Sequence, residues 1–414
     1  MKKILKISVP IIILVFCYFL FKPVITYNFG REKLQDLSHL QLYINHSKQI
    51  KKRADSLLIS EFNKLKTPAL SASIGINDTL IWSNIIGYAD IDNRIIADSL
   101  TKFRIGSTSK ALTSIGLGVL IQTKKLKSQS LVKDFVPYAS HILSEITLEQ
   151  VASHTSGIRN YGTCFCFPIW EYYNNHEYNS IEESIAVFNN DELLFEPSTD
   201  FSYSSYNYTL LSGMMEKASE QKFLPFMQEK VFHPLYMNQT KADKKNQNKE
   251  NTAKFYEIDN GEVKESYEVN NSVKWAGGGF LSTTNDLVKL GNAVLNYRLL
   301  DSITTVKLFE PVKLNSGKIN SQNYGMGWRN DLNKDILKDG QNVNIIHHGG
   351  VAMGSSAMLI LLPEYNLTVA VTMNRNATSQ ETKNIFFNLP HKLASLFIPV
   401  SKQNDMGLIN ENNF

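Results

Sequence analysis

Cysteine is scarce in this chain: Cys17, Cys164 and Cys166 are its only three among 414 residues. That number excludes a disulfide-rich secreted scaffold. Cys164 and Cys166 lack the two-residue spacer and the second ligand pair of a zinc site, so we expect no metal. We interpret both as small apolar residues of an aromatic-rich loop, and an intermolecular disulfide is the open alternative.

The chain also lacks a basic stripe. Its formal net charge is +4, and Lys2, Lys3 and Lys6 at the very start carry most of that excess. Proteins that bind nucleic acid cluster lysine and arginine against the phosphates. We therefore expect no nucleic-acid partner. With 43% hydrophobic and 20% charged residues, the composition is that of a globular protein and excludes wholesale disorder or a coiled coil.

The longest apolar run covers residues 7–21 and is flanked by Lys6 and Lys22. It is shorter than the roughly 20 residues of a full membrane span, although snorkelling of the flanking lysines extends its reach. No small-residue cleavage site follows. We expect a cytoplasmic tail over 1–6 and an uncleaved signal anchor over 7–21, with the remainder in the periplasm or outside the cell. Cleavage, the competing interpretation, would release the chain into the same compartment.

Beyond the anchor we expect a stalk over 22–48, one domain over 49–400 and a polar tail over 401–414. Strand pairs near both ends of the domain, with a helical middle between them, predict an antiparallel sheet flanked by helices plus an inserted helical lobe, an α/β (α+β) fold. A site between two such lobes would lie in a cleft. The predicted elements are helices over Gln49–Lys66 and Glu381–Phe397 and strands over Ala69–Ile76, Thr79–Ile86, Ala357–Leu362 and Leu367–Met373.

Several catalytic motifs are absent: Gly-x-Ser-x-Gly, His-Glu-x-x-His and the phosphate-binding P-loop do not occur. The remaining nucleophile pattern is Ser-x-x-Lys, in which residues three apart on a helix share a face and a desolvated lysine can act as base. It begins at Ser99, Ser107, Ser130 and Ser219. Only Ser107 follows a strand-like segment with a glycine turn and opens an apolar helix. An ordinary helix N-cap is the alternative for Ser107, and chemistry alone does not separate the two.

The segment Phe103–Lys110 (FRIGSTSK) resembles the active-serine segment of the penicillin-recognising serine hydrolases, in particular the class C β-lactamases and D-alanyl-D-alanine carboxypeptidases. The resemblance covers residues 65–375 in collinear order. It implies a β-lactamase/transpeptidase-like fold and a serine hydrolase that needs no cofactor and no metal. Further matching segments are Gly87–Asp90, His154–Ile158, Ala276–Phe280, Tyr324–Trp328 and His347–Gly350.

The resemblance also implies roles for individual residues. Ser107 would be the nucleophile, Lys110 its base and Tyr203 the proton carrier to the leaving group. Ser205 stands where this family has asparagine, and its shorter side chain cannot reach as far toward a substrate.

His347-His348-Gly349 resembles the His-x-Gly element of the family. It implies that His347 binds the substrate or the Tyr203 proton network and that Gly349 allows close approach of the strand. The Gly350 amide would complete an oxyanion hole with that of Ser107. His348 would face the opposite side of the strand.

The sequence thus predicts an extracytoplasmic, membrane-anchored serine hydrolase acting through a Ser107 acyl-enzyme on an amide or ester. A D-amino-acid peptide of the cell wall is the first substrate class by resemblance. Esterase or β-lactamase activity at the same site is the alternative, and a non-catalytic, anchored wall-fragment binder is the rival from another class. A small-molecule or peptide substrate and the membrane are the expected partners; the oligomeric state is open.

Overall fold

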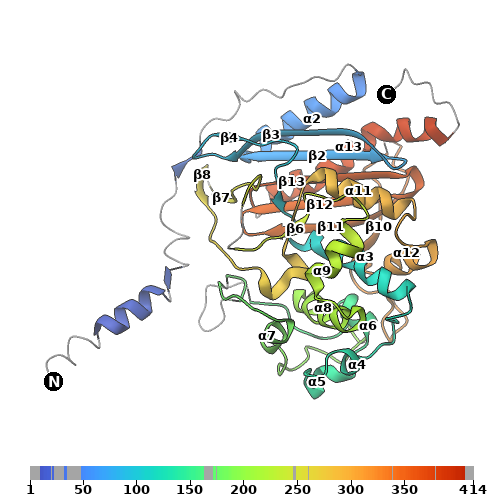
Figure 1. Cartoon of the computed structure of the whole chain (residues 1–414). Helices are drawn as coiled ribbons and strands as arrows, with labels where there is room; N and C mark the ends of the chain where they lie inside the picture. Colours follow the sequence, from blue (N-terminus) through green and yellow to red (C-terminus); the bar gives the residue numbers. More distant parts are fainter. Residues whose placement is uncertain are drawn as a thin grey trace.

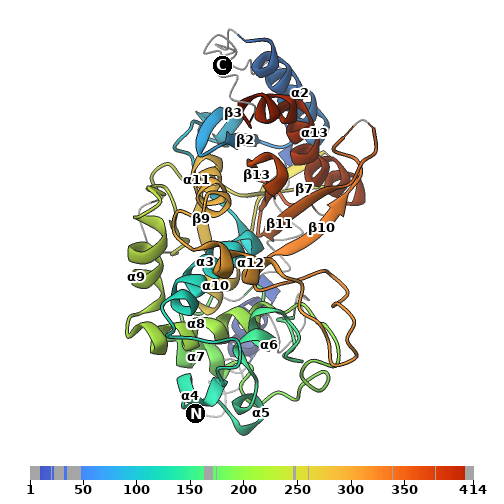
Figure 2. The same ribbon diagram turned by 90° about the vertical axis from the view of Figure 1, so that its right-hand side faces the viewer.

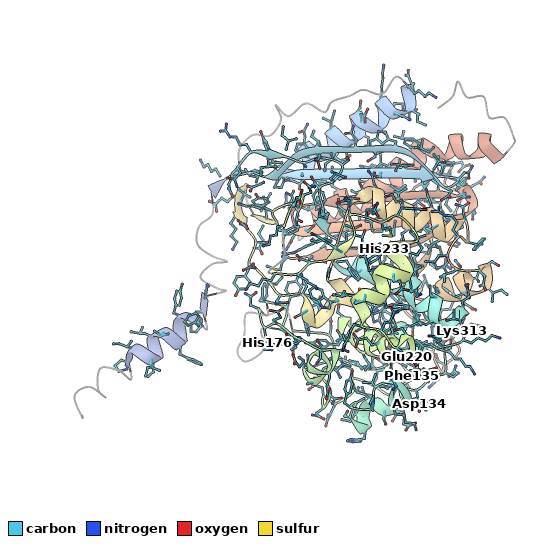
Figure 3. The ribbon with its side chains drawn as sticks, in the orientation of Figure 1. Asp134, Phe135, His176, Glu220, His233 and Lys313 are labelled. Atoms are coloured by element: carbon cyan, nitrogen blue, oxygen red, sulfur yellow. The ribbon has the colours of Figure 1, made fainter. Side chains whose placement is uncertain are left out.

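The computed structural model describes residues 10–19, 21–22, 32–34, 48–162, 171–173, 175–245, 249–259, 261–337, 339–377 and 379–405. Figure 1 shows a sheet covered by helices and, beside it, a lobe made of helices from the middle of the chain. The side chains between the two are drawn in Figure 3, where the labelled Asp134, Phe135 and Glu220 lie in the helical lobe, away from the sheet.

The main sheet is antiparallel and joins the two ends of the domain. Its central neighbours are β2 and β13, paired with Ala72 opposite Val371, and every residue of both strands is buried. Such continuous burial fits strands covered on both faces. In spatial order the sheet consists of β10 (Arg329–Asn333), β11 (Val343–Ala352), β12 (Ser355–Leu362), β13 (Leu367–Met373), β2 (Ala69–Ile76), β3 (Thr79–Asp90) and β4 (Ile95–Ile96).

Helices cover both faces of this sheet. One face packs against α11 (Thr284–Leu295), which begins where the Thr283 side chain accepts a hydrogen bond from the Asp286 amide. The other face packs against α2 (Gln49–Leu65) and α13 (Gln380–Asp405), which also contact each other. Figures 1 and 2 agree on this layering.

The helical lobe is built around α3 (Ser109–Gln122) and α8 (Ser205–Ser219), whose side chains are almost entirely buried. The other helical segments, from this lobe and its borders, are η1 (Gly106–Thr108), α4 (Val132–Phe135), α5 (His141–Ser144), α6 (Leu148–Ala152), α7 (Ile181–Ala186), α9 (Phe223–Met227), η2 (Gln228–Phe232), η3 (Ser272–Lys274), α10 (Trp275–Gly278), α12 (Ser302–Phe309) and η4 (Pro363–Tyr365). Two small sheets complete the fold: β5 (Phe103–Arg104) with β9 (Phe280–Ser282) and β6 (Lys241–Ala242), and β1 (Glu32–Lys33) with β8 (Glu262–Glu265) and β7 (Tyr256–Asp259).

The predicted helices and strands are confirmed, with β3 and α13 longer than expected. The local structure at Ser107 differs from the prediction, because Ser107 lies in the 3₁₀ turn η1 and the α-helix begins only at Ser109. The antiparallel sheet with flanking helices and a helical lobe is likewise confirmed.

The predicted anchor is only partly within the described residues. Residues 10–19 are helical, and no described helix is long and apolar enough to cross a membrane. Most of the predicted stalk, residues 406–414 of the predicted tail, and both Cys164 and Cys166 lie outside the described residues.

Candidate active site

Ser107 sits where a short strand turns into a buried helix. β5 runs into Gly106, whose φ of +50° lies in the region that favours glycine. A Cβ on Gly106 would lie 2.7 Å from the Val351 carbonyl oxygen of β11. The turn therefore lets η1 press against β11, and it places the partly exposed Ser107 at the wall of a cavity.

Lys110 lies one turn further on and is fully buried. Its Nζ lies 3.3 Å from Ser107 Oγ, 3.1 Å from Ser205 Oγ and 2.7 Å from the carbonyl oxygen of Gly277 in α10. Three elements, η1, α8 and α10, thus hold the amine, and α8 and α10 lie side by side in Figure 2. Ser107, Lys110 and Ser205, predicted separately, are brought together.

The surroundings of Lys110 disfavour its charged form. Burial lowers the pKa of the amine well below its ordinary value, and the nearby cations Arg329 and Lys274 lower it further. The amine also lies above the aromatic rings of Tyr203 and Tyr208, at 4.8 and 5.4 Å from their centroids. A neutral amine beside a hydroxyl is the arrangement that a general base needs.

Tyr203 precedes α8 and lines the same cavity as Ser107. Burial and the Tyr324 phenol raise its pKa well above the ordinary value, and the adjacent Ser107 hydroxyl offsets part of that rise. Its hydroxyl is buried and has no hydrogen-bond partner of good geometry among the described residues. The phenol therefore stays protonated, and its unused donor is available to a ligand.

His154 packs against the Tyr203 ring. The two rings are 4.4 Å apart at their centroids, and His154 Nδ1 lies 3.2 Å from Asn207 Nδ2. Burial, together with Lys110 and Arg329, lowers the pKa of His154 well below its ordinary value. The imidazole is therefore a neutral packing partner.

The two histidines of β11 point to opposite faces of the strand, and His347 lines the candidate cavity while His348 packs against Tyr203. His347 lines the same cavity as Ser107 and Tyr203, and its Nε2 lies 2.7 Å from Asp331 Oδ2 of β10. His348 is fully buried on the Tyr203 side, with its ring centroid 6.3 Å from that of Tyr203 and its Nε2 3.0 Å from the Tyr324 hydroxyl. Alternation along the strand permits only one of the pair to face Tyr203, and the motif alone could not say which.

The two glycines show a one-residue offset from the prediction. A Cβ on Gly350 would lie 2.0 Å from the Ile105 carbonyl oxygen and 2.8 Å from the Ser107 nitrogen. A Cβ on Gly349 would instead meet the Met358 and Phe387 side chains at 3.1 Å, on the α13 side. The close approach to the Ser107 turn, predicted for Gly349, therefore occurs at Gly350.

A cavity of about 710 Å³ opens beside these groups and contains residues that the motifs did not reveal. Its apolar wall includes Ile345, Met358 and Phe387, and its polar wall includes Arg329 and Asp331. Hydrogen bonds from His347 and Asn323 hold the pKa of Asp331 below its ordinary value, although burial opposes them. The only sequence signal for Arg329 and Asp331 was their place just after the Tyr324–Trp328 segment.

Arg329 lines this cavity and lies near two aromatic rings. Its guanidinium carbon is 5.5 Å from the Tyr203 ring centroid and 5.3 Å from that of Tyr324. Its Nε and Nη2 donate to Gln322 Oε1. The guanidinium thus places a fixed positive charge in the wall of the cavity that Ser107 also lines.

Comparison with known proteins identifies the family of the chain. The sequence profile of the Beta-lactamase family matches residues 56–388. The human serine beta-lactamase-like protein LACTB, mitochondrial, is 29% identical over 73% of this chain and 70% of its own length. Penicillin-binding protein 4* of Bacillus subtilis is 23% identical over 76% of this chain and 70% of its own length.

A similar fold occurs in the D-amino acid amidase of Ochrobactrum anthropi SV3, solved with D-phenylalanine. The TM-score is 0.71 at 17% identity, and the match covers 86% of this chain and all of that one. At this identity the likeness concerns the fold alone.

Proposed function

The chain belongs to the beta-lactamase family, and from this premise we propose that it is a serine hydrolase in which Ser107 forms an acyl-enzyme with an amide or ester. One observation carries the proposal: a fully buried Lys110 amine, whose pKa is held well below its ordinary value by burial, lies 3.3 Å from the Ser107 hydroxyl at the wall of a cavity. Burying an amine costs free energy of folding. The position of this amine beside the Ser107 hydroxyl allows it to take the hydroxyl proton.

The proposed reaction begins when Lys110 removes the Ser107 proton and the oxygen attacks the carbonyl carbon. The amide of Ser107 and that of Gly350 on β11 would stabilise the oxyanion. Tyr203 would give its proton to the leaving group and regain one from the Lys110 ammonium, since its raised pKa keeps it a phenol. Water then attacks the acyl-enzyme by the same route in reverse.

For the substrate we propose a small peptide or amide with a carboxylate near the scissile bond, with a D-amino-acid peptide of the cell wall first. Arg329 supports a carboxylate, and the Ile345, Met358 and Phe387 wall supports an apolar side chain. A cavity of about 710 Å³ has the usual size for a small-molecule site. Relatives named as a penicillin-binding protein and a D-amino acid amidase are consistent with this class.

We also propose the extracytoplasmic location predicted above, with a signal anchor over 7–21 and the hydrolase domain over 49–400. Support comes from the apolar side chains of helical residues 10–19, of which Ile12 and Leu14 are 65% and 69% exposed. Exposed apolar surface of this kind calls for a lipid or protein partner. Carbonate extraction of membranes tests this: release of the full-length chain into the supernatant would contradict the anchor.

Active-site labelling tests the nucleophile. Wild-type protein should react with a fluorophosphonate, and Ser107→Ala should not. Ser99→Ala is the matched control, because Ser99 begins the same four-residue pattern but is exposed, and it should label like wild type. An unlabelled wild type, or an equally labelled Ser107→Ala, would contradict the proposal and favour a non-catalytic binding protein.

A substrate panel then separates the activities. A D-Ala-D-Ala peptide, a nitrophenyl ester and a cephalosporin represent peptidase, esterase and β-lactamase action. Arg329→Met should weaken the peptide reaction more than the ester reaction, because only the peptide carries a carboxylate. Equal losses on both substrates would show that Arg329 does not select the carboxylate.

A further inference from the structure

The wall of the candidate cavity carries two opposite charges on one strand. Arg329 and Asp331 both line the cavity and lie two residues apart on β10, so their side chains leave the same face of the strand, with Cα atoms about 7 Å apart. They do not pair with each other: among the described residues, the only basic side chain at ion-pairing distance from Asp331 is His347. The cavity therefore presents a separate positive and a separate negative group to a ligand.

Asp331 keeps its negative charge. Burial opposes ionisation, but hydrogen bonds from His347 and Asn323 outweigh it and hold the pKa of Asp331 below its ordinary value. His347 Nε2 and Asn323 Nδ2 lie 2.7 and 2.8 Å from the two carboxylate oxygens. The Asp331 side chain is still 32% exposed, and a carboxylate can accept more than two hydrogen bonds. A donor on a ligand can therefore reach it.

The histidines beside Asp331 do not cancel this charge. His347 donates from Nε2 to Asp331, and its Nδ1 is buried without a hydrogen-bond partner among the described residues. A protonated ring would carry a second N–H at Nδ1, buried without an acceptor, which is costly, so the geometry favours the neutral ring. His391 of α13 also lines the cavity, and burial lowers its pKa to about 4, so it is uncharged at neutral pH. The Asp331 carboxylate thus has no cation paired with it among the described residues.

An apolar surface accompanies the two charges. Ile345 is paired directly opposite Asp331, and it lines the cavity together with Met358 and Phe387. Methylene groups pack favourably on such a surface. The stems of lysine-like side chains, with three or four methylenes, bridge a distance of about 7 Å between two charged ends. The wall therefore matches a single residue that carries a carboxylate at its backbone end and an amine at its side-chain end.

We propose that the cavity selects peptides whose last residue is basic: Arg329 binds the terminal carboxylate, Asp331 binds the side-chain amine, and the apolar wall holds the methylenes between them. This inference rests on the proposed function, since the bond that breaks is the amide before this residue. Ser107 displaces the residue, whose nitrogen takes the proton from Tyr203, and water then releases the acyl group. The products are a shortened peptide and a free basic amino acid.

Protection of Ser107 from fluorophosphonate labelling tests this preference with the full chain. The probes are N-acetyl-D-alanyl-D-lysine and N-acetyl-D-alanyl-D-norleucine, because they differ only in the side-chain amine. The lysine peptide should halve the labelling rate at a concentration about tenfold or more below that of the norleucine peptide, the gain expected from one charge-assisted hydrogen bond. Protection measures binding, so the comparison does not depend on how fast either peptide is cleaved.

Asp331→Asn should remove the preference, because the amide keeps the shape of the side chain but not its charge. The two peptides should then protect Ser107 within about twofold of each other, since no charge-assisted bond to the amine remains. Asp339→Asn is the matched control: Asp339 is an exposed carboxylate of the connection between β10 and β11 and does not line the cavity. That variant should keep the wild-type preference.

Two results would overturn the inference: equal protection of wild type by the two peptides, and a preference for the lysine peptide that survives Asp331→Asn. Should unprotected Asp331→Asn fail to label, the salt dependence of the wild-type preference takes its place, because a charge pair weakens with salt and a preference based on shape does not. In each case normal labelling of wild type at Ser107 would leave the proposed function standing. A wild type that does not label at Ser107 would overturn both.

Discussion

At the scale of residues, the site depends on one amine kept neutral by its surroundings. Lys110 has no carboxylate partner among its described contacts; hydroxyls, a carbonyl oxygen and aromatic rings surround it. Arg329 and Lys274 add repulsion, and burial lowers the pKa of Lys274 itself to about 8. The same features that make Lys110 a base make it unfavourable for folding.

The activity should depend on pH through Lys110 and, near pH 8, through the neighbouring cation Lys274. The pKa of Lys110 is lowered, so activity is lost as the pH falls through that lowered value and the amine becomes protonated. The pKa of Tyr203 is raised, so no alkaline limb from this residue is expected below about pH 10. A kcat/KM profile on the nitrophenyl ester from pH 4 to pH 10 checks this. A fall that begins already near pH 9 would contradict the assignment of Tyr203.

The lowered pKa of Lys110 also predicts that the stability of wild type and that of Lys110→Met depend differently on pH. Between the lowered pKa of Lys110 in the fold and its pKa in the unfolded chain, the unfolded chain binds a proton that the folded chain excludes, so the free energy of unfolding rises with pH over that range. Relative to Lys110→Met, wild type should gain up to about 1.4 kcal/mol per pH unit between pH 7 and 9. Denaturant titrations of both proteins at the two pH values measure this. Parallel pH dependences would show that Lys110 is charged in the fold.

At the scale of elements, β11 is pressed against the turn that carries Ser107. Thr108 Oγ1 donates to the His348 carbonyl oxygen at 3.2 Å, and the Gly350 backbone lies directly against the Ile105 carbonyl oxygen. Strand and turn must therefore shift together. Ser107 and β11 can lie this close together because Gly350 has no side chain.

Gly350→Ala should separate strand and turn. The added methyl would meet backbone, which cannot yield as a side chain does, so we expect a loss of about 1–3 kcal/mol in the free energy of unfolding and strongly reduced labelling at Ser107. Gly349→Ala is the matched comparison, because its methyl would meet only the Met358 and Phe387 side chains; its losses should be smaller. Calorimetry and labelling rates measure both. Equal effects would contradict the special role of Gly350.

Much of this architecture could be predicted from sequence, because β2 and β13 are short runs of mostly apolar and small residues bounded by turn residues. The Ser107–Lys110 pair could also be predicted, since its spacing is local. Which of His347 and His348 faces Tyr203 could not be predicted, because a one-residue offset reverses the face of every side chain on a strand. Nor could the places of Arg329 and Asp331, since their contacts with the site arise only from tertiary packing.

At the scale of the whole molecule, a buried ion pair ties distant segments together. Arg104 Nε of β5 donates to Asp243 Oδ2, 2.6 Å away, and its Nη1 donates to the Met353 carbonyl oxygen between β11 and β12. Asn271 donates to the same Asp243 oxygen at 2.7 Å. Both charged side chains are only 9% exposed. The pair thus joins the serine-bearing strand, the helical middle and the main sheet.

Asp243→Asn should therefore be costly, since it leaves the Arg104 charge buried without its partner. We expect a loss of about 3 kcal/mol or more in the free energy of unfolding, the usual result of breaking a buried pair. Glu145→Gln breaks the exposed Lys133–Glu145 pair, whose side chains are 47% and 68% exposed, and should cost less than about 1 kcal/mol. Denaturant unfolding compares the two. Similar small losses would show that Arg104 finds another partner.

The pairing of β2 with β13 has a consequence for biosynthesis. β2 leaves the ribosome early, but its neighbour in the sheet is encoded almost 300 residues later, and α13 follows later still. Until then the β2–β3 hairpin has an open edge and an uncovered apolar face, a state prone to aggregation. The nascent chain therefore cannot complete its sheet while it is being made. Until β13 arrives, the open edge of β2 is therefore the part of the sheet most exposed to pairing with other chains.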